Sequence, residues 1–309
     1  MGRPGRHPGS RGVVGQPTTR RVTALRRVGI RDTPPNMQAF PSSPKALVTS
    51  LYRNRELVSS LVKREVAGRY RGSSLGILWS LFHPIALLAL YTLVFSSIFR
   101  ARWSEESSEP SSVFAVTLFA GLLTFNLFSE TLNRAPGLIV SNANFVKKVV
   151  FPLELLSVVS VLAAAFHLLV SLGVLLAAEA LLFHSLPTTV LFYPVILGPL
   201  LLACLGVSWV VSSLSVFLRD IAQLTGLVAT VLLFISAVFF PLHRLPGSIR
   251  PFLSLNPLAI TIEASRDVLI SGQMPSLLTL AALWMLGLAS AYLGFFWFQK
   301  TRKGFADVL

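Results

Sequence analysis

Six apolar runs constrain this chain more than any other feature of its sequence. A helix needs about 20 apolar residues to cross a hydrocarbon core of about 30 Å. The six runs cover residues 75–99, 113–132, 153–176, 188–217, 221–240 and 277–298. Only 13% of the 309 residues are charged, whereas soluble domains carry about 25%. We therefore predict an all-α integral membrane protein with six transmembrane helices, and we exclude a soluble fold.

The basic residues are divided unevenly between the two sides of the predicted spans. The side that holds both termini carries 22 of the 27 Lys and Arg residues, so the positive-inside rule predicts cytoplasmic termini in a bacterial plasma membrane. The other side carries Arg100, Arg102, Arg244, Arg250 and Arg266. A net charge of +14 would suggest nucleic-acid binding in a soluble chain. Here it is explained by membrane topology, and we predict no nucleic-acid partner.

Residues 1–44 differ in composition from the rest of the chain. They are rich in Arg, Gly, Pro and Ser and contain no apolar stretch, which is typical of a disordered tail. We predict a basic, cytoplasmic tail at 1–44 and one transmembrane domain at 45–309.

The segment before the first span has the pattern of an amphipathic helix. At 100° per residue, most apolar side chains of residues 47–66 fall on one side and most polar ones on the other, and we predict an interface helix over 45–70. Asn54, Arg55 and Glu65 interrupt the apolar side. The pattern predicts a helix lying in the cytoplasmic interface, with Gly68 and Gly72 permitting a turn into the first span.

The external segment at 241–275 contains signals for a short helix. Asn256 suits an N-cap, Pro257 the first helical position and Gly272 the position after the helix. The helix between them has about 15 residues, too few to cross a bilayer. We predict a re-entrant helical hairpin, which requires cover by protein; an interfacial loop is the alternative.

Motifs for catalysis and nucleotide binding are missing from the sequence. It contains neither G-x-x-x-x-G-K-[ST] nor H-E-x-x-H, and its single cysteine, Cys204, lies in an apolar run. His167 is alone in the third span. Glu130, Glu154 and Glu179 lie near span ends, which argues against a proton-coupled transporter. We predict no enzyme activity, metal or cofactor in this chain.

Four stretches resemble one family. They are "KREVAGRYRGSSLGILWSLFHPIALLALYTLVFSSIF" (63–99), "NRAPGLIVSNANFVKKVVFPLELL" (133–156), "SLNPLAITIEASRDVLISG" (254–272) and "FADVL" (305–309). The chain from about residue 45 to its end is similar to the polysaccharide-export branch of ABC-2 type permeases, the Wzm/TagG/KpsM-like membrane subunit.

This resemblance implies a partner and a substrate. Two copies would form the pore, each with a cytoplasmic ATPase subunit that binds ATP and Mg²⁺. The substrate would be a polysaccharide linked to undecaprenyl pyrophosphate, of the O-antigen, teichoic acid or galactan type.

The resemblance also implies roles for particular residues. The ATPase-coupling loop would contain Asn142, Asn144, Phe145, Lys147 and Lys148, with Arg219 and Asp220 as a second contact. Ordinary positive-inside charge is the alternative for the two lysines.

Lys63, Arg64, Arg69 and Arg71 lie where the resemblance places a pyrophosphate head, which arginine can bind through two hydrogen bonds. Anchoring to anionic lipid headgroups, at about 1 kcal/mol per charge, is the alternative.

Aromatic rings can stack on the apolar faces of sugars, so the first span supplies candidates for a glycan channel: Trp79, Phe82, Tyr91, Phe95 and Phe99. Packing against lipid or neighbouring helices is the alternative for each. The external hairpin supplies Phe252, Leu253 and Leu258 as candidates for a gate.

Two other functions stay open at this point. The chain could be an ABC-2 permease for a drug or small lipid, or a non-transporting enzyme or scaffold of cell-envelope glycan assembly.

Overall fold

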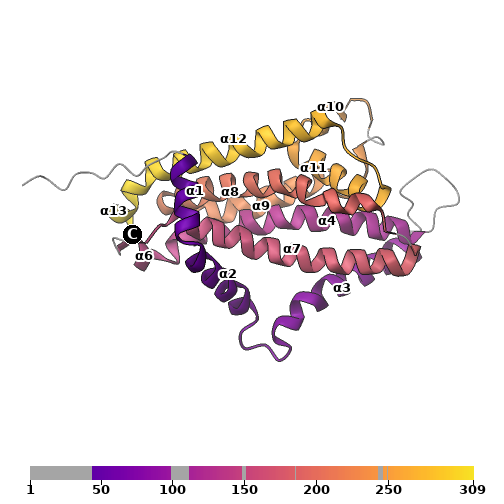
Figure 1. Cartoon of the computed structure of the whole chain (residues 1–309), viewed down its shortest axis with the longest axis horizontal. Helices are drawn as coiled ribbons and strands as arrows, with labels where there is room; N and C mark the ends of the chain where they lie inside the picture. The colour runs from indigo at the N-terminus through magenta and orange to yellow at the C-terminus, as the bar shows by residue number, and fades with distance from the viewer. Residues whose placement is uncertain (1–43, 99–110, 148–150, 185, 243–245, 249) are drawn as a thin grey trace, which may run out of the picture. The chain divides into compact units, whose positions relative to one another are not determined.

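The computed structural model describes residues 44–98, 111–147, 151–184, 186–242, 246–248 and 250–309. Every regular element in these residues is helical, as predicted (Figure 1). Residues 1–43 of the predicted tail at 1–44, together with Phe99 and Lys148, lie outside the described residues.

Five of the six predicted spans are helices long and apolar enough to cross a membrane. Their principal elements are α3 (Trp79–Tyr91), α4 (Ser111–Arg134), α7 (Glu154–Phe183), α8 (Tyr193–Phe217) and α12 (Leu277–Thr301). A single turn of 3-10 helix, η1 (Gly76–Leu78), precedes α3, and a π-helical turn, η2 (Thr92–Ile98), follows it.

The remaining predicted span, 221–240, is only partly helical. Its helix α9 (Ile221–Ile235) has 15 residues, and the chain leaves helical geometry at Ser236. Ala237 has a positive φ of 56°, which is uncommon for a residue with a side chain. The sequence pattern could not predict this break, because the apolar composition continues through Phe240.

Helix α11 (Pro257–Arg266) pairs the backbone that α9 leaves exposed. The Asn256 amide donates to Ile235 O (3.2 Å) and Ser236 Oγ (2.9 Å). The Arg266 guanidinium donates to the carbonyls of Ala237 (2.7 Å) and Val238. Irregular backbone survives in a membrane protein where other protein groups pair it, and α11 supplies those groups here.

The helix signals in the external segment are confirmed. Asn256 Oδ1 accepts a hydrogen bond from Leu258 N as an N-cap, and Pro257 is the first residue of α11. After α11, the π-helical turn η5 (Asp267–Ser271) ends at Gly272, whose φ is +69°. The shorter helix α10 (Arg250–Ser254) precedes them.

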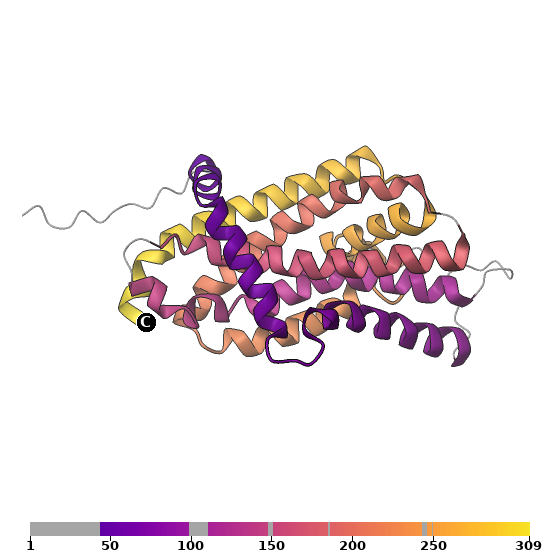
Figure 2. The same ribbon diagram turned by 60° about the horizontal axis from the view of Figure 1, so that its bottom comes forward.

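Helices α8 and α12 lie side by side along most of their length (Figures 1 and 2). Gly206 and Gly294 face each other, and a Cβ on either would overlap the backbone of the other helix. Gly287 faces the backbone of Pro199 in the same way. Small residues at such a contact allow helix backbones to approach closely, as in other membrane helix pairs.

The predicted interface helix forms as two helices, α1 (Pro44–Arg53) and α2 (Arg55–Tyr70), divided at Asn54. Helix α2 crosses the bundle obliquely (Figure 2) and packs on α7, burying Val58, Leu61 and Val66. Gly72, with a φ of +87°, lies in the turn that leads to α3.

One end of the bundle holds α1, α6 (Ala143–Lys147) and α13 (Phe305–Val308) and is called the terminal end below (Figure 1). Phe305 is fully buried there against Phe217 and Phe298. The helix α5 (Gly137–Val140) packs on α8 at this end, where Ser215 Oγ of α8 donates a hydrogen bond to Pro136 O, just before α5 (2.8 Å).

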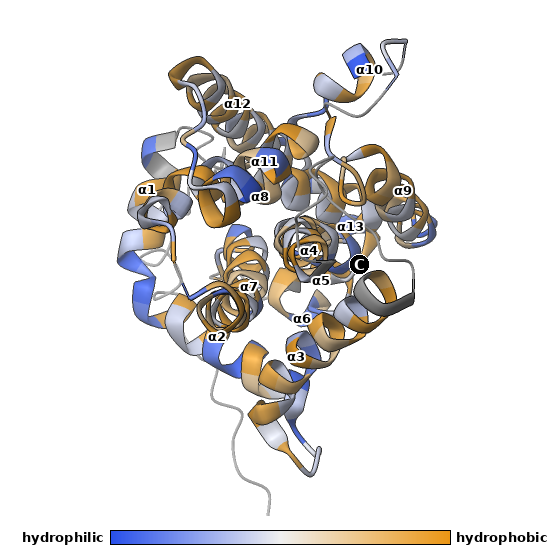
Figure 3. Ribbon diagram, turned by 90° about the vertical axis from the view of Figure 1, so that its right-hand side faces the viewer, coloured by the Kyte–Doolittle hydropathy of each residue, from blue (hydrophilic) through white to orange (hydrophobic). Residues whose placement is uncertain are grey.

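Large apolar side chains remain exposed on the outer faces of α3, α9 and α12, for example Leu90, Phe234 and Leu288. Hydrophobic residues dominate these helices (Figure 3). A helix surface of this kind requires lipid or another protein as its neighbour.

Candidate functional site

A cavity of about 1090 Å³ opens between α2 and α3 on one side and α4 and α7 on the other. Helix α2 and the turn after it contribute Arg64, Arg69 and Tyr70; α3 contributes Trp79, His83 and Tyr91; α4 contributes Asn126, Ser129, Glu130, Asn133 and Arg134; α7 contributes His167 and Ser171. The wall of a predicted membrane bundle is therefore polar at this place.

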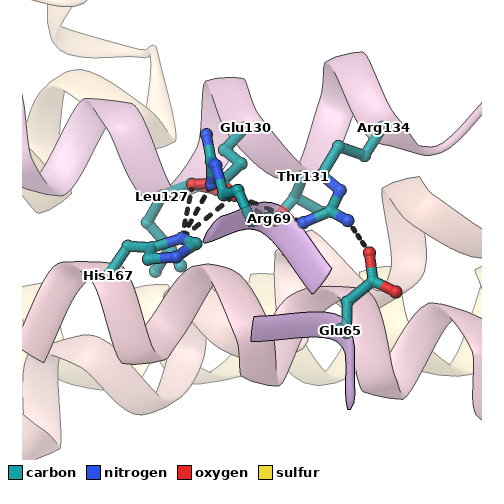
Figure 4. A network of polar contacts seen from close by, with 7 residues as sticks. All are labelled: Glu65, Arg69, Leu127, Glu130, Thr131, Arg134 and His167. Carbon is teal, nitrogen blue, oxygen red and sulfur yellow. Dashed lines mark hydrogen bonds and ion pairs between the residues drawn. The ribbon is translucent and has the colours of Figure 1, made fainter. Parts of the chain in front are cut away.

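An ion-pair network links α2 to α4 at the rim of the cavity (Figure 4). Arg69 Nη1 lies 2.5 Å from Glu130 Oε1, and Arg134 pairs with Glu65. Arg134 also approaches Glu130 at 3.5 Å, one helical turn away. Glu65, which interrupts the apolar side of the predicted interface helix, is thus explained by a partner on α4.

His167, the single histidine of the predicted third span, belongs to this network. Its Nδ1 lies 3.2 Å from Glu130 Oε1, while its Nε2 is buried without a hydrogen-bond partner among the described residues. Arg69 Nη1, which can only donate, lies closer to Nδ1, at 2.9 Å. Nδ1 accepts from Arg69 when it carries no proton and donates to Glu130 when it carries one, so the direction of these bonds depends on the tautomer.

The network lies about one hydrocarbon thickness from the far end of α4. Glu130 is 19 residues after Ser111, which corresponds to about 28 Å at 1.5 Å per residue. A bilayer core is about 30 Å thick. This separation is compatible with a position of Arg69 and Glu130 near one boundary of the hydrocarbon core.

The polar face of α4 is not among the predicted site residues. Asn126 and Asn133 are exposed although they lie in an apolar span, and both line the cavity together with Ser129. Their spacing of three and four residues places them on one helix face, and this signal is visible in the sequence. A polar side chain facing hydrocarbon is unfavourable, so the cavity explains their exposure.

The predicted glycan-channel residues divide into two groups. Trp79 and Tyr91 line the cavity. Phe82 is about half exposed and contacts Trp79 edge-on, with ring centroids 5.1 Å apart. Phe95 packs against Tyr91 and Phe114. The structure thus brings only part of the aromatic set to one surface.

The predicted pyrophosphate contacts also divide. Arg64 and Arg69 line the cavity, whereas Lys63 and Arg71 are exposed outside its lining. The charge of Arg69 is already paired with Glu130.

The predicted ATPase contacts lie at the terminal end. Asn142 is fastened to Leu138 O (2.9 Å), Asn144 is exposed, and Phe145 stacks on Phe151 with centroids 4.4 Å apart. Lys147 is the last residue of α6. Arg219 and Asp220 are exposed between α8 and α9. Helix α13 contacts both α6 and α8, so the two predicted contact segments belong to one end of the bundle.

A second ion pair supports this end. Arg302 Nη1 donates to Glu154 Oε2 (2.8 Å), Arg302 Nη2 donates to Phe151 O (3.0 Å), and Ser50 Oγ donates to Glu154 Oε1 (3.2 Å). The Glu154 and Arg302 side chains are 8% and 13% exposed. They join α1, α7 and the end of α12.

The three predicted gate residues do not gather on one surface. Leu258 is buried in the main apolar core, and Leu253 packs near Ala237 and Ala259. Phe252 is 75% exposed. Within the described ranges, no three His, Cys, Asp or Glu side chains are placed to hold a metal ion.

The chain is similar to known membrane transport proteins. Residues 56–270 match the ABC-2 type transporter family. An O-antigen export system permease protein RfbA of Myxococcus xanthus is 27% identical over 264 residues, covering 84% of this chain and 98% of the relative. A relative of the same name in Klebsiella pneumoniae is 23% identical, with 82% and 95% covered. The polysialic acid transport protein KpsM of Escherichia coli is 27% identical, with 77% and 90% covered.

Proposed function

Because the chain belongs to the ABC-2 type transporter family, we propose that it is the membrane subunit of an exporter of lipid-linked polysaccharide. The observation that carries this proposal is the polar cavity of about 1090 Å³ between apolar helices. The names of three relatives, two for O-antigen export and one for polysialic acid transport, support a polysaccharide as the cargo.

The lining of the cavity suits an amphiphile with a sugar and an anionic head. Arg64 and Arg69 at its rim can donate charge-assisted hydrogen bonds to phosphate oxygens. Trp79 and Tyr91 present aromatic faces, and Asn126 presents an amide. We propose that the substrate is carried on undecaprenyl pyrophosphate and enters the cavity from the terminal, cytoplasmic side.

A separate ATPase subunit would supply the energy. The match to an ABC transporter family implies such a partner. We propose a homodimer of this chain with two ATPase copies docked at the terminal end, on α6 and the Arg219–Asp220 turn. The buried Glu154–Arg302 pair supports this end as a rigid platform.

The substrate is tested in proteoliposomes that contain the chain and its ATPase. We expect a polyprenyl-pyrophosphate-linked oligosaccharide to stimulate ATP hydrolysis, because its head and sugars both meet the cavity lining. Small amphiphiles and polyprenyl phosphate without sugar are the controls. Equal stimulation by small amphiphiles would favour a drug or small-lipid permease. Conversion of the glycolipid by the chain without ATPase would favour an enzyme.

Replacement of Phe145 by Ala is expected to weaken co-purification of the ATPase subunit about thirtyfold. The change removes the ring that stacks on Phe151, and aromatic side chains at interface centres commonly contribute 2 kcal/mol or more. Pull-down and basal ATP hydrolysis measure the effect. Phe252→Ala, which removes an exposed ring from α10, is the control. Unchanged assembly of the Phe145→Ala variant would refute the docking site.

A further inference from the structure

Arg69 does not present a free positive charge to the cavity. The rim network contains two acids, Glu65 and Glu130, and two arginines, Arg69 and Arg134, which pair one to one. An anionic head that enters the cavity therefore meets a neutralised network, with the charge of Arg64 beside it. It can bind Arg69 fully only if Arg69 exchanges its partner.

The two sides of the Arg69–Glu130 pair differ in burial. The Arg69 side chain is 48% exposed, whereas that of Glu130 is 18% exposed. The Arg69 guanidinium is the tip of a long, flexible side chain in the last turn of α2, whereas the Glu130 carboxylate lies between α4 and α7. The arginine is therefore the partner that can move toward a ligand, while the carboxylate stays in place.

Glu130 has other donors that remain when Arg69 leaves. His167 Nδ1 lies 3.2 Å from Oε1 and 3.3 Å from Oε2 of Glu130 and 2.9 Å from Arg69 Nη1, so it can donate to the carboxylate when it carries a proton. Arg134 Nη1 lies 3.5 Å from Oε1. A mostly buried carboxylate that loses its only partner is strongly destabilised. Because His167 and Arg134 stay next to Glu130, its carboxylate keeps partners when Arg69 moves, and the exchange of Arg69 becomes feasible.

We propose that Glu130 is a built-in competitor that holds Arg69 until a pyrophosphate head displaces it. Glu130 thereby lowers the affinity of the cavity for its anionic substrate. Substrate binding breaks the Arg69–Glu130 ion pair between α2 and α4, while the Glu65–Arg134 ion pair continues to link the two helices. His167 is a positioning residue that holds the vacated carboxylate. The inference rests on the proposed function and adds to it a residue that opposes binding.

The test measures binding of farnesyl pyrophosphate to the full chain in nanodiscs, with farnesol and inorganic pyrophosphate in parallel. Glu130→Gln is expected to tighten farnesyl pyrophosphate binding about fivefold, because loss of the carboxylate frees Arg69, a gain of about 1 kcal/mol. Glu130→Asp, with its carboxylate one methylene further from Arg69, is expected to give a smaller gain. Arg69→Gln is expected to weaken binding about tenfold.

Glu65→Gln is the matched control, since it removes the same charge from the same rim but leaves Glu130 on Arg69. It frees Arg134 instead of Arg69, and it is expected to tighten binding less than Glu130→Gln does, because Arg134 keeps Glu130 as a second partner at 3.5 Å. Equal tightening by Glu65→Gln and Glu130→Gln would reduce the effect to general electrostatics and overturn the proposal. Weakening by Glu130→Gln would also overturn it, because Glu130 would then orient Arg69 for binding.

Two outcomes separate this inference from the proposed function. If Arg69→Gln weakens binding but Glu130→Gln leaves it unchanged, the competitor role fails and the anion site stands. If the unmodified chain binds farnesol as tightly as farnesyl pyrophosphate, the proposed substrate fails and the inference fails with it. If the variants rank in the same order of affinity for inorganic pyrophosphate, the exchange is supported, and the phosphate groups suffice for binding without the lipid.

Discussion

Replacement of Arg266 by Met is expected to lower the free energy of unfolding by about 4 kcal/mol or more. The side chain is 3% exposed and donates to three backbone carbonyls, those of Thr117, Ala237 and Val238. A hydrogen bond from a charged donor contributes about 1.5–3 kcal/mol, and a buried carbonyl without a donor is unfavourable. Methionine fills a similar volume but donates nothing, so the unwound end of α9 would lose its main support.

The measurement is thermal unfolding of the detergent-solubilised chain, followed by its size-exclusion profile. Arg250→Met is the control, since Arg250 is exposed on α10 in the same external segment; it is expected to unfold like the unmodified chain. Arg266→Lys keeps the charge but lacks the guanidinium fork, so it should recover only part of the loss. Unchanged stability of Arg266→Met would show that α9 does not depend on these bonds.

Breaking the Glu154–Arg302 pair is the second prediction with a large effect. Arg302→Met is expected to destabilise the chain by about 3–5 kcal/mol, because it strands a buried carboxylate. The double variant Glu154→Leu/Arg302→Met should recover most of that loss, since apolar replacement of a whole buried pair is often neutral.

The same unfolding assay measures this cycle. Lys300→Met is the control, because Lys300 is exposed in the last turn of α12, close to Arg302 in sequence. A double variant no more stable than Arg302→Met would contradict the expected coupling. ATPase co-purification of the same variants is expected to fall in the order of their stabilities, because the pair supports the platform at the terminal end.

Arg266 and Arg302 also show that a count of basic residues on each side of the membrane can hide a structural role. Arg266 contributes to the tally of external basic charges, yet it is buried and its partners are carbonyls from α4 and the break after α9. Arg302 lies in the basic C-terminal segment, and its partner Glu154 is 148 residues away. Both side chains stabilise packing in addition to any effect on orientation.

The candidate site was predicted only in part, because some of its contacts join residues that are far apart in the sequence. Arg64 and Arg69, with Trp79 and Tyr91, could be proposed because basic and aromatic residues next to a span are visible in a short window of sequence. The polar spacing of α4 is also visible there, but what this face and the α7 wall do is not. Asn126, Glu130 and His167 acquire a role only when α4 and α7 are placed beside α2 and α3.

The sequence by itself determined the helical class, five of the six predicted spans, the start of α11 at Asn256 and Pro257, and the end of η5 at Gly272. Apolar length, N-caps and glycines with positive φ act over a few neighbouring residues. Only the tertiary structure decided that α9 ends at Ile235, that Arg266 supports that end, and that Arg69 is held by Glu130. The physical reason is distance along the chain: Arg69 and Glu130 are 61 residues apart, and Arg69 and His167 are 98 apart. Such pairs depend on how whole helices pack, which no local pattern encodes.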